Sequence, residues 1–300
     1  MTEEQRSFAI AEAIGEPAPE ITILDIGAMP TGTERYHALV AQGCGKVYGV
    51  EPSETALEEV AAEESDRFIP HFLGNGRPAT FYETRFPGCS SLLEPNEEMI
   101  NLFQTIGAEP ETGNFAVMNT ATVETVWLDD LDMLPDIDFI SIDTQGSELD
   151  ILTNGENVPS KALILESEVE FVPLYKDQPL FGHLQVALSE RGFMMHKLID
   201  IVGRAFRPFR GLDLLKPVSQ MLWADAIFVR DFTALDKFSD LDLIKAATIL
   251  NDVYMSHDLA LFFLMPHDER RGGTHAAAYL RKYIEVQPTH IYYGNFKGIA

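Results

Sequence analysis

Short apolar runs alternate with amphipathic segments through the first two thirds of the chain. Runs typical of buried strands occupy residues 20–26, 46–51, 68–73, 139–143 and 162–168, and helical spacing appears over 34–42, 54–64 and 148–153. Strands that alternate with helices predict an α/β protein, with a mostly parallel central sheet flanked by helices.

Both ends of the chain are predicted to be helical. We expect an N-terminal helix over residues 1–19, an α/β domain over 20–233, and a C-terminal helical extension over 234–300 that packs on this domain. Residues 79–96 depart from the alternation and are predicted to form a hairpin-like excursion followed by a loop. Asn96 then has the character of an N-cap.

Composition narrows the class of protein. With 47 acidic residues against 22 basic ones, the formal charge is −25, which disfavours nucleic acid or an anionic membrane as the main partner. The longest apolar run, LALFFLM, is too short to span a bilayer, and MTEEQRSF is unlike a secretory signal. We expect a cytoplasmic protein with no membrane span, in which Cys44 and Cys89 stay reduced, and the apolar tail is a candidate homodimer surface.

The stretch ILDIGAMPTGTERYHAL is predicted to form a strand, a glycine-bearing turn and a helix. Four residues separate Gly27 from Gly32, as in a P-loop, but Thr33 and Glu34 stand where lysine and Ser/Thr belong. A carboxylate there would repel a triphosphate. Met29 stands where a dinucleotide-binding fold has its second glycine. Both phosphate-binding fingerprints are therefore disfavoured.

A ligand with a ribose but no phosphate fits this turn, and S-adenosylmethionine has these properties. Asp25 is placed to order the turn or meet the ammonium group of the ligand. Glu51, in YGVEP, ends the next strand, where an acidic residue accepts ribose hydroxyls. The alternative is a glycine turn of an unrelated α/β protein with a solvated glutamate. The candidate cofactor-binding residues of these two strand ends are Asp25, Gly27, Ala28, Gly32, Thr33, Glu51 and Pro52.

Together with DIGA, VEP and TVWLDDL, the segment ISIDTQGSELDIL resembles the FkbM family of S-adenosylmethionine-dependent methyltransferases. Further segments, GCSSLLEPN, ESEVEFVPLYKDQPLFGHL and MLWADAIFVRD, resemble one subgroup, and the resemblance covers roughly residues 20–265. It implies a class I, Rossmann-like methyltransferase fold, and commonly methyl transfer to a hydroxyl oxygen of a sugar, glycolipid or polyketide. It also places Gly27, Ala28, Gly32, Glu51 and Asp143 around the cofactor.

One motif departs from the family pattern. A tetrapeptide that often reads Asp-Val-Glu-Gly or Asp-Val-Gln-Gly is Asp143-Thr144-Gln145-Gly146 in this chain. Asp143 ends a central strand, where open α/β sheets bind ligands, and we expect it to contact the cofactor and to act in catalysis. Its alternative role is to cap the next helix through the amides of Gly146 or Ser147.

Three carboxylates follow on the next strand. Glu166, Glu168 and Glu170 alternate along LESEVEF and would point to one face. A hydroxyl acceptor benefits from a base with a pKa near neutrality, so Glu168 is a candidate catalytic residue and Glu166 a candidate substrate-binding one. The alternative is a solvent-facing row at a sheet edge. A divalent metal stays possible because His71, His183 and His196 are present, but no histidine spacing supports it, and we assign no metal ligands.

Two loops supply further candidates. Gly74 and Asn75 follow the third strand and are expected to face the adenine, unless they form a type I′ hairpin turn. Ser90 and Ser91 offer hydroxyls to the substrate on a loop above the cofactor, and the neighbouring Cys89 is interpreted as structural.

The segment GRAFRPFRG is locally basic. We expect Arg207 to bind an anionic acceptor as part of a lid, with paired surface arginines as the alternative.

The sequence thus predicts an S-adenosylmethionine-dependent O-methyltransferase acting on a small-molecule or glycan acceptor. Two alternatives stay open. One is transfer to nitrogen or carbon, and the absence of an NPPY-type tetrapeptide after the fourth strand weakens transfer to nitrogen. The other is a non-catalytic module that uses the same fold as an interaction platform.

Overall fold

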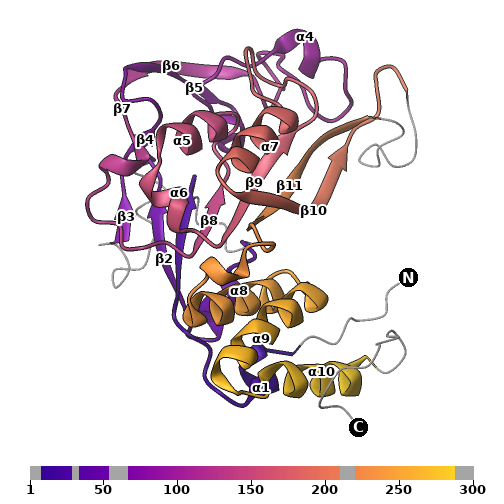
Figure 1. Ribbon diagram of the computed structural model, residues 1–300. Coiled ribbons are helices and arrows are strands. Elements are labelled where there is room, and N and C mark those ends of the chain that lie inside the picture. The colour runs from indigo at the N-terminus through magenta and orange to yellow at the C-terminus, as the bar shows by residue number, and fades with distance from the viewer. Residues whose placement is uncertain (1–7, 29–33, 54–66, 210–219, 288–300) are drawn as a thin grey trace. The chain divides into compact units, whose positions relative to one another are not determined.

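A computed structural model of the chain describes residues 8–28, 34–53, 67–209 and 220–287 (Figure 1). The chain divides into two compact units. The sheet unit comprises residues 24–30 and 48–230, and the helical unit comprises residues 1–23, 31–47 and 231–300.

The strands of the described residues are β1 (Ile21–Ile26), β2 (Gly45–Val50), β3 (Phe68–Ile69), β4 (Phe72–Leu73), β5 (Ala79–Thr84), β6 (Val117–Val123), β7 (Thr125–Val126), β8 (Phe139–Ile142), β9 (Ile164–Glu170), β10 (Phe193–Gly203) and β11 (Met221–Arg230). The α-helices are α1 (Ile10–Ile14), α2 (His37–Ala41), α4 (Glu97–Ile100), α5 (Glu148–Asn154), α6 (Asn157–Lys161), α7 (Phe181–Glu190), α8 (Asp240–Asp252), α9 (His257–Arg271) and α10 (His275–Val286).

The central sheet has seven strands in the order β10-β11-β9-β8-β1-β2-β3. Strand β8 pairs in parallel with β9, and β2 with β3, whereas β11 is antiparallel to both β9 and β10. This is the doubly wound order of nucleotide-binding folds, with the last strand inserted antiparallel. The predicted class I methyltransferase fold is therefore confirmed.

The strand order reverses between β1 and β8. In an open α/β sheet, ligands bind in the crevice beyond the carboxyl ends of the strands at such a reversal. Gly27 follows β1 and Asp143 follows β8, and the Asp143 amide donates a 3.0 Å hydrogen bond to the Ile26 carbonyl. The fold thus brings two candidate motifs together at this edge.

Buried apolar side chains explain why these segments form the sheet. All six residues of β1 are buried, as expected for a strand covered on both faces. Helices α5 and α7 lie against the sheet (Figure 1), and their Ile151, Leu184 and Leu188 pack with Leu165 of β9 in one continuous core. The helices hold the carboxyl ends of β8 and β9 in fixed positions.

The segment after β4 differs from the prediction. Strand β5 pairs with β6, more than thirty residues away, and it contacts the following loop through the antiparallel bridge between Tyr82 and Ser91 and the bond from Thr84 to Ser90. Strand β4 pairs with β7 rather than with β5. The hairpin alternative for Gly74 and Asn75 is therefore wrong, because a strand distant in sequence supplies the partner of β4. The predicted hairpin-like excursion is limited to the antiparallel bridge between Tyr82 and Ser91.

In the helical unit, α8, α9 and α10 pack on one another and on α1. Ser239 and Asp242 form a reciprocal capping box at the start of α8. Asn251 donates a 2.8 Å bond to the Phe8 carbonyl, and Asp252 accepts a 2.9 Å bond from the Ile10 amide. The division into segments 1–19, 20–233 and 234–300 stays a prediction.

None of the helices in the described ranges is both long enough and apolar enough to cross a membrane.

Candidate active site

The turn after β1 contacts the end of β8 directly. Gly27 has φ +86°, and a Cβ on it would lie 2.0 Å from the Asp143 carbonyl oxygen. Its amide donates to the Val50 carbonyl of β2 at 2.9 Å. Only glycine combines this backbone conformation with this approach. The neighbouring Ala28 is 3% exposed, so the turn presents backbone to the crevice.

Glu51 lies directly after β2 and is buried. Its Oε1 accepts a 2.7 Å hydrogen bond from the Ser53 amide. Burial raises the pKa of Glu51, and the bond from Ser53 offsets part of this shift. No other hydrogen bond to this carboxylate comes from the described residues, so Oε2 is available to a ligand donor. Pro52 follows it and is half-buried.

One amide joins two carboxylates at the ends of β8 and β9. The Gln145 Nε2 donates to Asp143 Oδ1 at 2.8 Å and to Glu168 Oε2 at 2.6 Å. An amide nitrogen carries two protons, so it can satisfy both acceptors at once. The Gln145 Oε1 in turn accepts from the buried Tyr175 hydroxyl at 2.9 Å. Asp143 and Glu168, predicted from separate motifs, are thus held as a pair.

The environment raises the pKa of both paired carboxyl groups. For Glu168 the main cause is desolvation, followed by the negative charge of Asp143, and the pKa lies well above its usual value. Desolvation also raises the pKa of Asp143, but the hydrogen bonds from Gln145 and Glu168 oppose the shift. The Asp143 side chain is solvent-exposed, which further moderates its shift. Two carboxyl groups with unequal pKa values can divide acid and base roles.

Glu148 binds the Thr144 and Gly146 amides of the β8–α5 turn, whereas Asp143 accepts from the Gln145 amide. Its Oε1 accepts from the Thr144 amide at 2.8 Å, and its Oε2 accepts from the Gly146 amide at 3.0 Å. The side chain is 5% exposed, and burial raises its pKa. This leaves Asp143 free of a capping role at Gly146.

The row of glutamates on β9 lies inside the sheet, with Glu166 and Glu170 buried and Glu168 half-buried. Glu166 and Glu170 are 8% and 3% exposed, and β9 has β8 and β11 on its two sides. The alternative of a solvent-facing edge row is therefore wrong. Desolvation and the charge of Glu148 raise the pKa of Glu170 well above its usual value. Glu166 faces Ile227 in the neighbouring strand.

Of the remaining cofactor candidates, Asp25 is buried within β1. Gly74 packs on Thr125, and its amide donates to the Val126 carbonyl at 3.0 Å. Asn75 is exposed, and its Oδ1 accepts from the Arg77 amide at 3.2 Å in a local turn. Gly32 and Thr33 lie outside the described residues.

The two serines have structural partners. Ser91 is 2% exposed, and its hydroxyl donates to the Gln145 carbonyl at 2.7 Å. The Ser90 hydroxyl accepts from the Thr84 amide at 3.1 Å. Ser91 therefore supports the pair of carboxylates through Gln145. Burial and the charges of Glu168 and Asp143 raise the pKa of the Cys89 thiol to about 12, so it is not a nucleophile.

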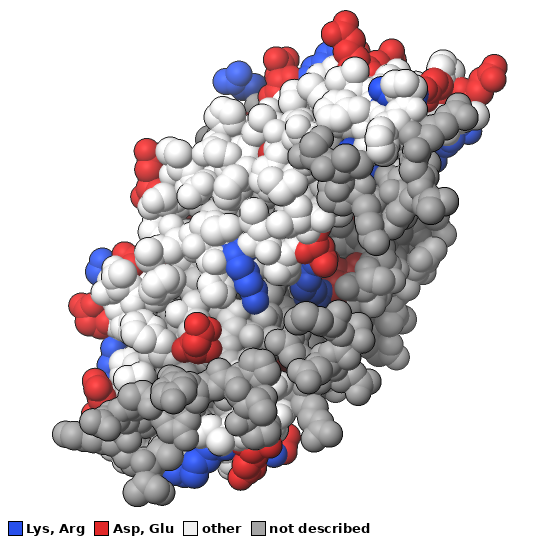
Figure 2. All heavy atoms as spheres, turned by 90° about the vertical axis from the view of Figure 1, so that its right-hand side faces the viewer, with Lys and Arg blue, Asp and Glu red and all other residues white. Residues whose placement is uncertain are grey.

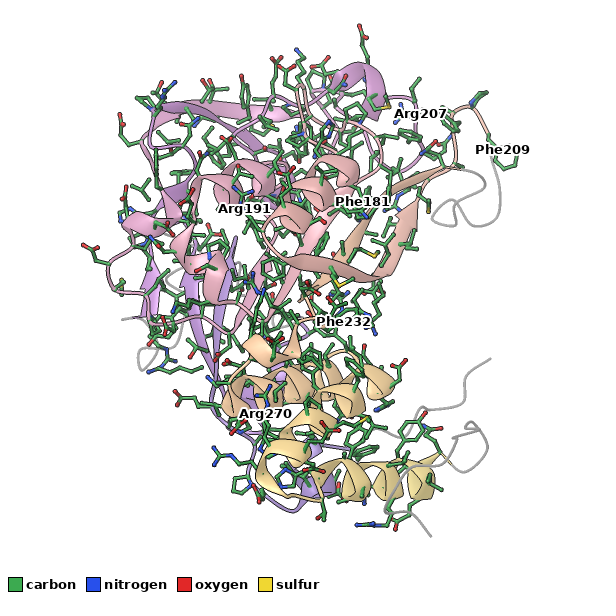
Figure 3. The ribbon with its side chains drawn as sticks, viewed as in Figure 1. Phe181, Arg191, Arg207, Phe209, Phe232 and Arg270 are labelled. Atoms are coloured by element: carbon green, nitrogen blue, oxygen red, sulfur yellow. The ribbon has the colours of Figure 1, made fainter. Side chains whose placement is uncertain are left out.

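The Arg207 side chain binds groups of its own chain. Its guanidinium donates to the carbonyls of Phe103 and Ile106, both at 2.8 Å, and pairs with Glu109 at 2.8 Å. In Figure 3, Arg207 lies near α4 while Phe209 points away from the fold. These bonds agree with the alternative of a paired surface arginine.

Among the described residues, the carboxylates of this site form no group of three or more with ligand atoms close enough to share a metal ion.

The sequence did not identify Gln145 or Tyr175 as site residues. Both nevertheless hold the paired carboxylates in place, Gln145 directly and Tyr175 through its bond to Gln145. A signal was present at Gln145, because it stands inside the motif that departs from the family pattern. Tyr175 lies in the segment that follows the glutamate row. Its hydroxyl lies between the Gln145 Oε1 and the Cys89 carbonyl and shares its one proton between them. No sequence pattern indicated this role.

Comparison with known proteins identifies one family. The sequence profile of the methyltransferase FkbM domain matches residues 25–195, more than half of the chain. No curated protein sequence matches.

Several solved structures are similar at low identity. One is precorrin-6y C5,15-methyltransferase from Geobacter metallireducens GS-15, with 10% identity, a TM-score of 0.35, and coverage of 77% of this chain and 94% of that chain. Another is magnesium protoporphyrin IX methyltransferase from Synechocystis PCC 6803 with bound S-adenosylmethionine, with 13% identity, a TM-score of 0.32, and coverage of 74% and 76%. A third is TrmK from M. capricolum in complex with S-adenosyl-homocysteine, with 12% identity, a TM-score of 0.31, and coverage of 94% and 99%.

Proposed function

The chain belongs to the FkbM methyltransferase family, for which S-adenosylmethionine is the methyl donor, and we propose that it methylates a hydroxyl oxygen of a sugar, glycolipid or secondary metabolite. The observation that supports this acceptor is the pair Asp143 and Glu168, joined by the Gln145 amide at the ends of β8 and β9. A hydroxyl must lose its proton as it is methylated, and a tuned carboxylate can accept that proton.

The residues beyond β1 and β2 fit this cofactor. The glycine turn at Gly27 lets a ligand approach the backbone, and the open oxygen of Glu51 suits the ribose hydroxyls. When bound, the cofactor supplies an electrophilic methyl group on sulfur. Gly27, Ala28 and Glu51 would hold its adenosine part, and Asp143 would lie beside its reactive end.

In this mechanism, the chain orients the acceptor and receives its proton. Glu168 would accept the hydroxyl proton of the acceptor as its oxygen takes up the methyl group that the bound cofactor would supply. The Gln145 amide holds the Glu168 carboxylate toward Asp143. Burial and the charge of Asp143 raise the pKa of Glu168, which makes its carboxylate a stronger base for the hydroxyl proton.

The acceptor is proposed to be a small molecule or glycan rather than nucleic acid. The chain carries a net charge of −25. On the face in Figure 2, the Lys and Arg side chains of the described residues are scattered among acidic and uncharged ones. A polyanion would gain little from such a surface.

Because Cys44 and Cys89 are buried free thiols, we also propose a reducing, cytoplasmic location.

The test uses methyl-labelled S-adenosylmethionine with glycan, glycolipid and metabolite extracts, followed by mass spectrometry of the products. We expect an O-methylated product, and about a 10²- to 10⁴-fold lower kcat in Glu168→Gln. The affinity for the cofactor, measured by calorimetry, should remain at its wild-type value. Glu190→Gln, at the exposed end of α7, is the matched control and should leave kcat unchanged. An N-methylated product, or full activity in Glu168→Gln, would contradict the proposal.

A further inference from the structure

Two histidines and an aspartate lie together in the helical unit, outside the segment that matches the family profile. His267 and Asp268 belong to the last turns of α9, and His275 is the first residue of α10 (Figure 1). One potential ligand atom from each residue lies within 4.8 Å of the other two. Among the described residues, no other group of three or more His, Cys, Asp or Glu side chains meets this condition.

The two imidazoles stack with their centroids 5.1 Å apart and place buried, unpartnered nitrogens near the same carboxylate oxygen. The Nδ1 atoms of His267 and His275 are buried and have no hydrogen-bond partner. They lie 3.7 Å and 4.0 Å from Asp268 Oδ1, too far for a hydrogen bond. A buried polar atom without a partner is costly. A shared cation would satisfy both nitrogens at once.

The contact of the second ring nitrogen of His275 also supports a cation shared by the two histidines. His275 Nε2 lies 3.3 Å from Glu16 Oε1. A carboxylate at Nε2 favours the tautomer with its proton there, which leaves the Nδ1 lone pair directed at Asp268. Carboxylates commonly orient metal-binding histidines in this way.

The backbone holds Asp268 in place. Its Oδ1 accepts from the His275 amide at 3.0 Å, and its Oδ2 accepts from the Ala276 amide at 2.8 Å. A carboxylate oxygen has two lone pairs, so Oδ1 can also bind a cation. A Cβ on Gly273 would lie 2.6 Å from this oxygen. Glycine at this position therefore makes room for the carboxylate.

We propose that His267, Asp268 and His275 form a site for a divalent transition-metal cation, with Zn²⁺ as the best match. Two imidazole nitrogens and one carboxylate oxygen are a typical zinc ligand set. Ligand atoms around tetrahedral zinc lie roughly 3.4 Å apart, so zinc binding would draw the two nitrogens closer to Asp268 Oδ1 and turn the stacked imidazole rings toward the ion. A water molecule completes the coordination. The ion joins the end of α9 to the start of α10 across the Gly272–Gly273 turn and stabilises the helical unit.

The test is zinc titration of the full chain after chelator treatment, without a polyhistidine tag. Calorimetry should find one Zn²⁺ per chain, and thermal unfolding should shift to higher temperature with Zn²⁺ but not with Mg²⁺, which prefers oxygen ligands. His267→Gln and His275→Gln should each weaken zinc binding by at least about tenfold. His71→Gln, at an exposed histidine of the sheet unit, is the matched control and should bind as wild type does.

Glu16→Gln provides a variant whose folding is not in question, because Glu16 is 64% exposed. It should weaken zinc binding several-fold while leaving the circular dichroism spectrum unchanged. Absence of binding by the wild-type chain at about 1 mM Zn²⁺ would overturn the proposal. So would wild-type affinity in the folded His267→Gln/His275→Gln double variant, because the zinc would then bind elsewhere. Neither outcome bears on methyl transfer.

Discussion

At the scale of single residues, Gln145 determines how the candidate catalytic groups meet. Its backbone has φ +57°, a left-handed conformation that costs a non-glycine residue on the order of 1–3 kcal/mol when its surroundings impose it. The Ser91 hydroxyl holds the Gln145 carbonyl, and the Tyr175 hydroxyl holds its side-chain oxygen. Strain of this kind is often found at functional sites, and here it directs one amide to two carboxylates.

Replacement of Gln145 should therefore change the titration of Glu168. In Gln145→Met, the two carboxylates lose their shared donor, so the pKa of Glu168 rises further and kcat at neutral pH falls by about tenfold or more. The rising limb of the kcat–pH profile should move to higher pH. Carbon NMR of the glutamate carboxyl groups checks the same shift without an acceptor. Gln185→Met, on the exposed face of α7, is the control, and an unmoved Glu168 titration would exclude this role.

At the scale of elements, the sequence predicted the strands of the central sheet but not the pairing of β5 with β6. Apolar runs predicted β1, β2, β8 and β9 from the sequence, because buried parallel strands have a continuous apolar signature. The pairing of β5 with β6 could not be predicted in this way. Six of the seven β6 residues are exposed, and pairing between distant strands leaves no local pattern.

A comparison of two glycines separates backbone strain from steric overlap. Gly27→Ala should lose at least about 2 kcal/mol of unfolding free energy and bind S-adenosylmethionine at least about tenfold more weakly, because its Cβ would overlap the Asp143 carbonyl. Gly43 has a similar φ of +74°, but nothing lies within 4 Å of its Cβ position. Gly43→Ala should lose only about 1 kcal/mol and leave cofactor affinity unchanged. Chemical denaturation and calorimetry measure both, and equal losses would refute the steric argument.

At the scale of the whole molecule, buried carboxyl groups link folding to pH. The pKa values of Glu168 and Glu170 lie well above the ordinary value of 4.5. Between that value and the folded pKa, the folded chain keeps protons that the unfolded chain has released. The free energy of unfolding therefore falls as the pH rises. This contribution is fully present below about pH 4.5 and is lost as the pH rises through the folded pKa.

Glu170→Gln should isolate this effect, because glutamine resembles the protonated acid. At about pH 8 the variant should be more stable than wild type by roughly 1–3 kcal/mol, and at about pH 4 the advantage should disappear. Guanidinium denaturation at both pH values measures the difference, with Glu190→Gln as the control for a change of net charge. A variant that is equally destabilised at both pH values would show that Glu170 stabilises the fold as an ion.

The sequence by itself determined the class of fold and the set of residues at the strand ends. Buried strands, glycine turns and helix caps are local features, and Gly27, Glu51 and Asp143 each stand at a fixed position relative to a strand. Only the tertiary structure decided how these residues meet. The bond from Gln145 to Glu168 joins residues 23 positions apart, and the two nitrogens directed at Asp268 come from different helices. Such contacts depend on how separate elements pack, and no periodicity of a single segment records that.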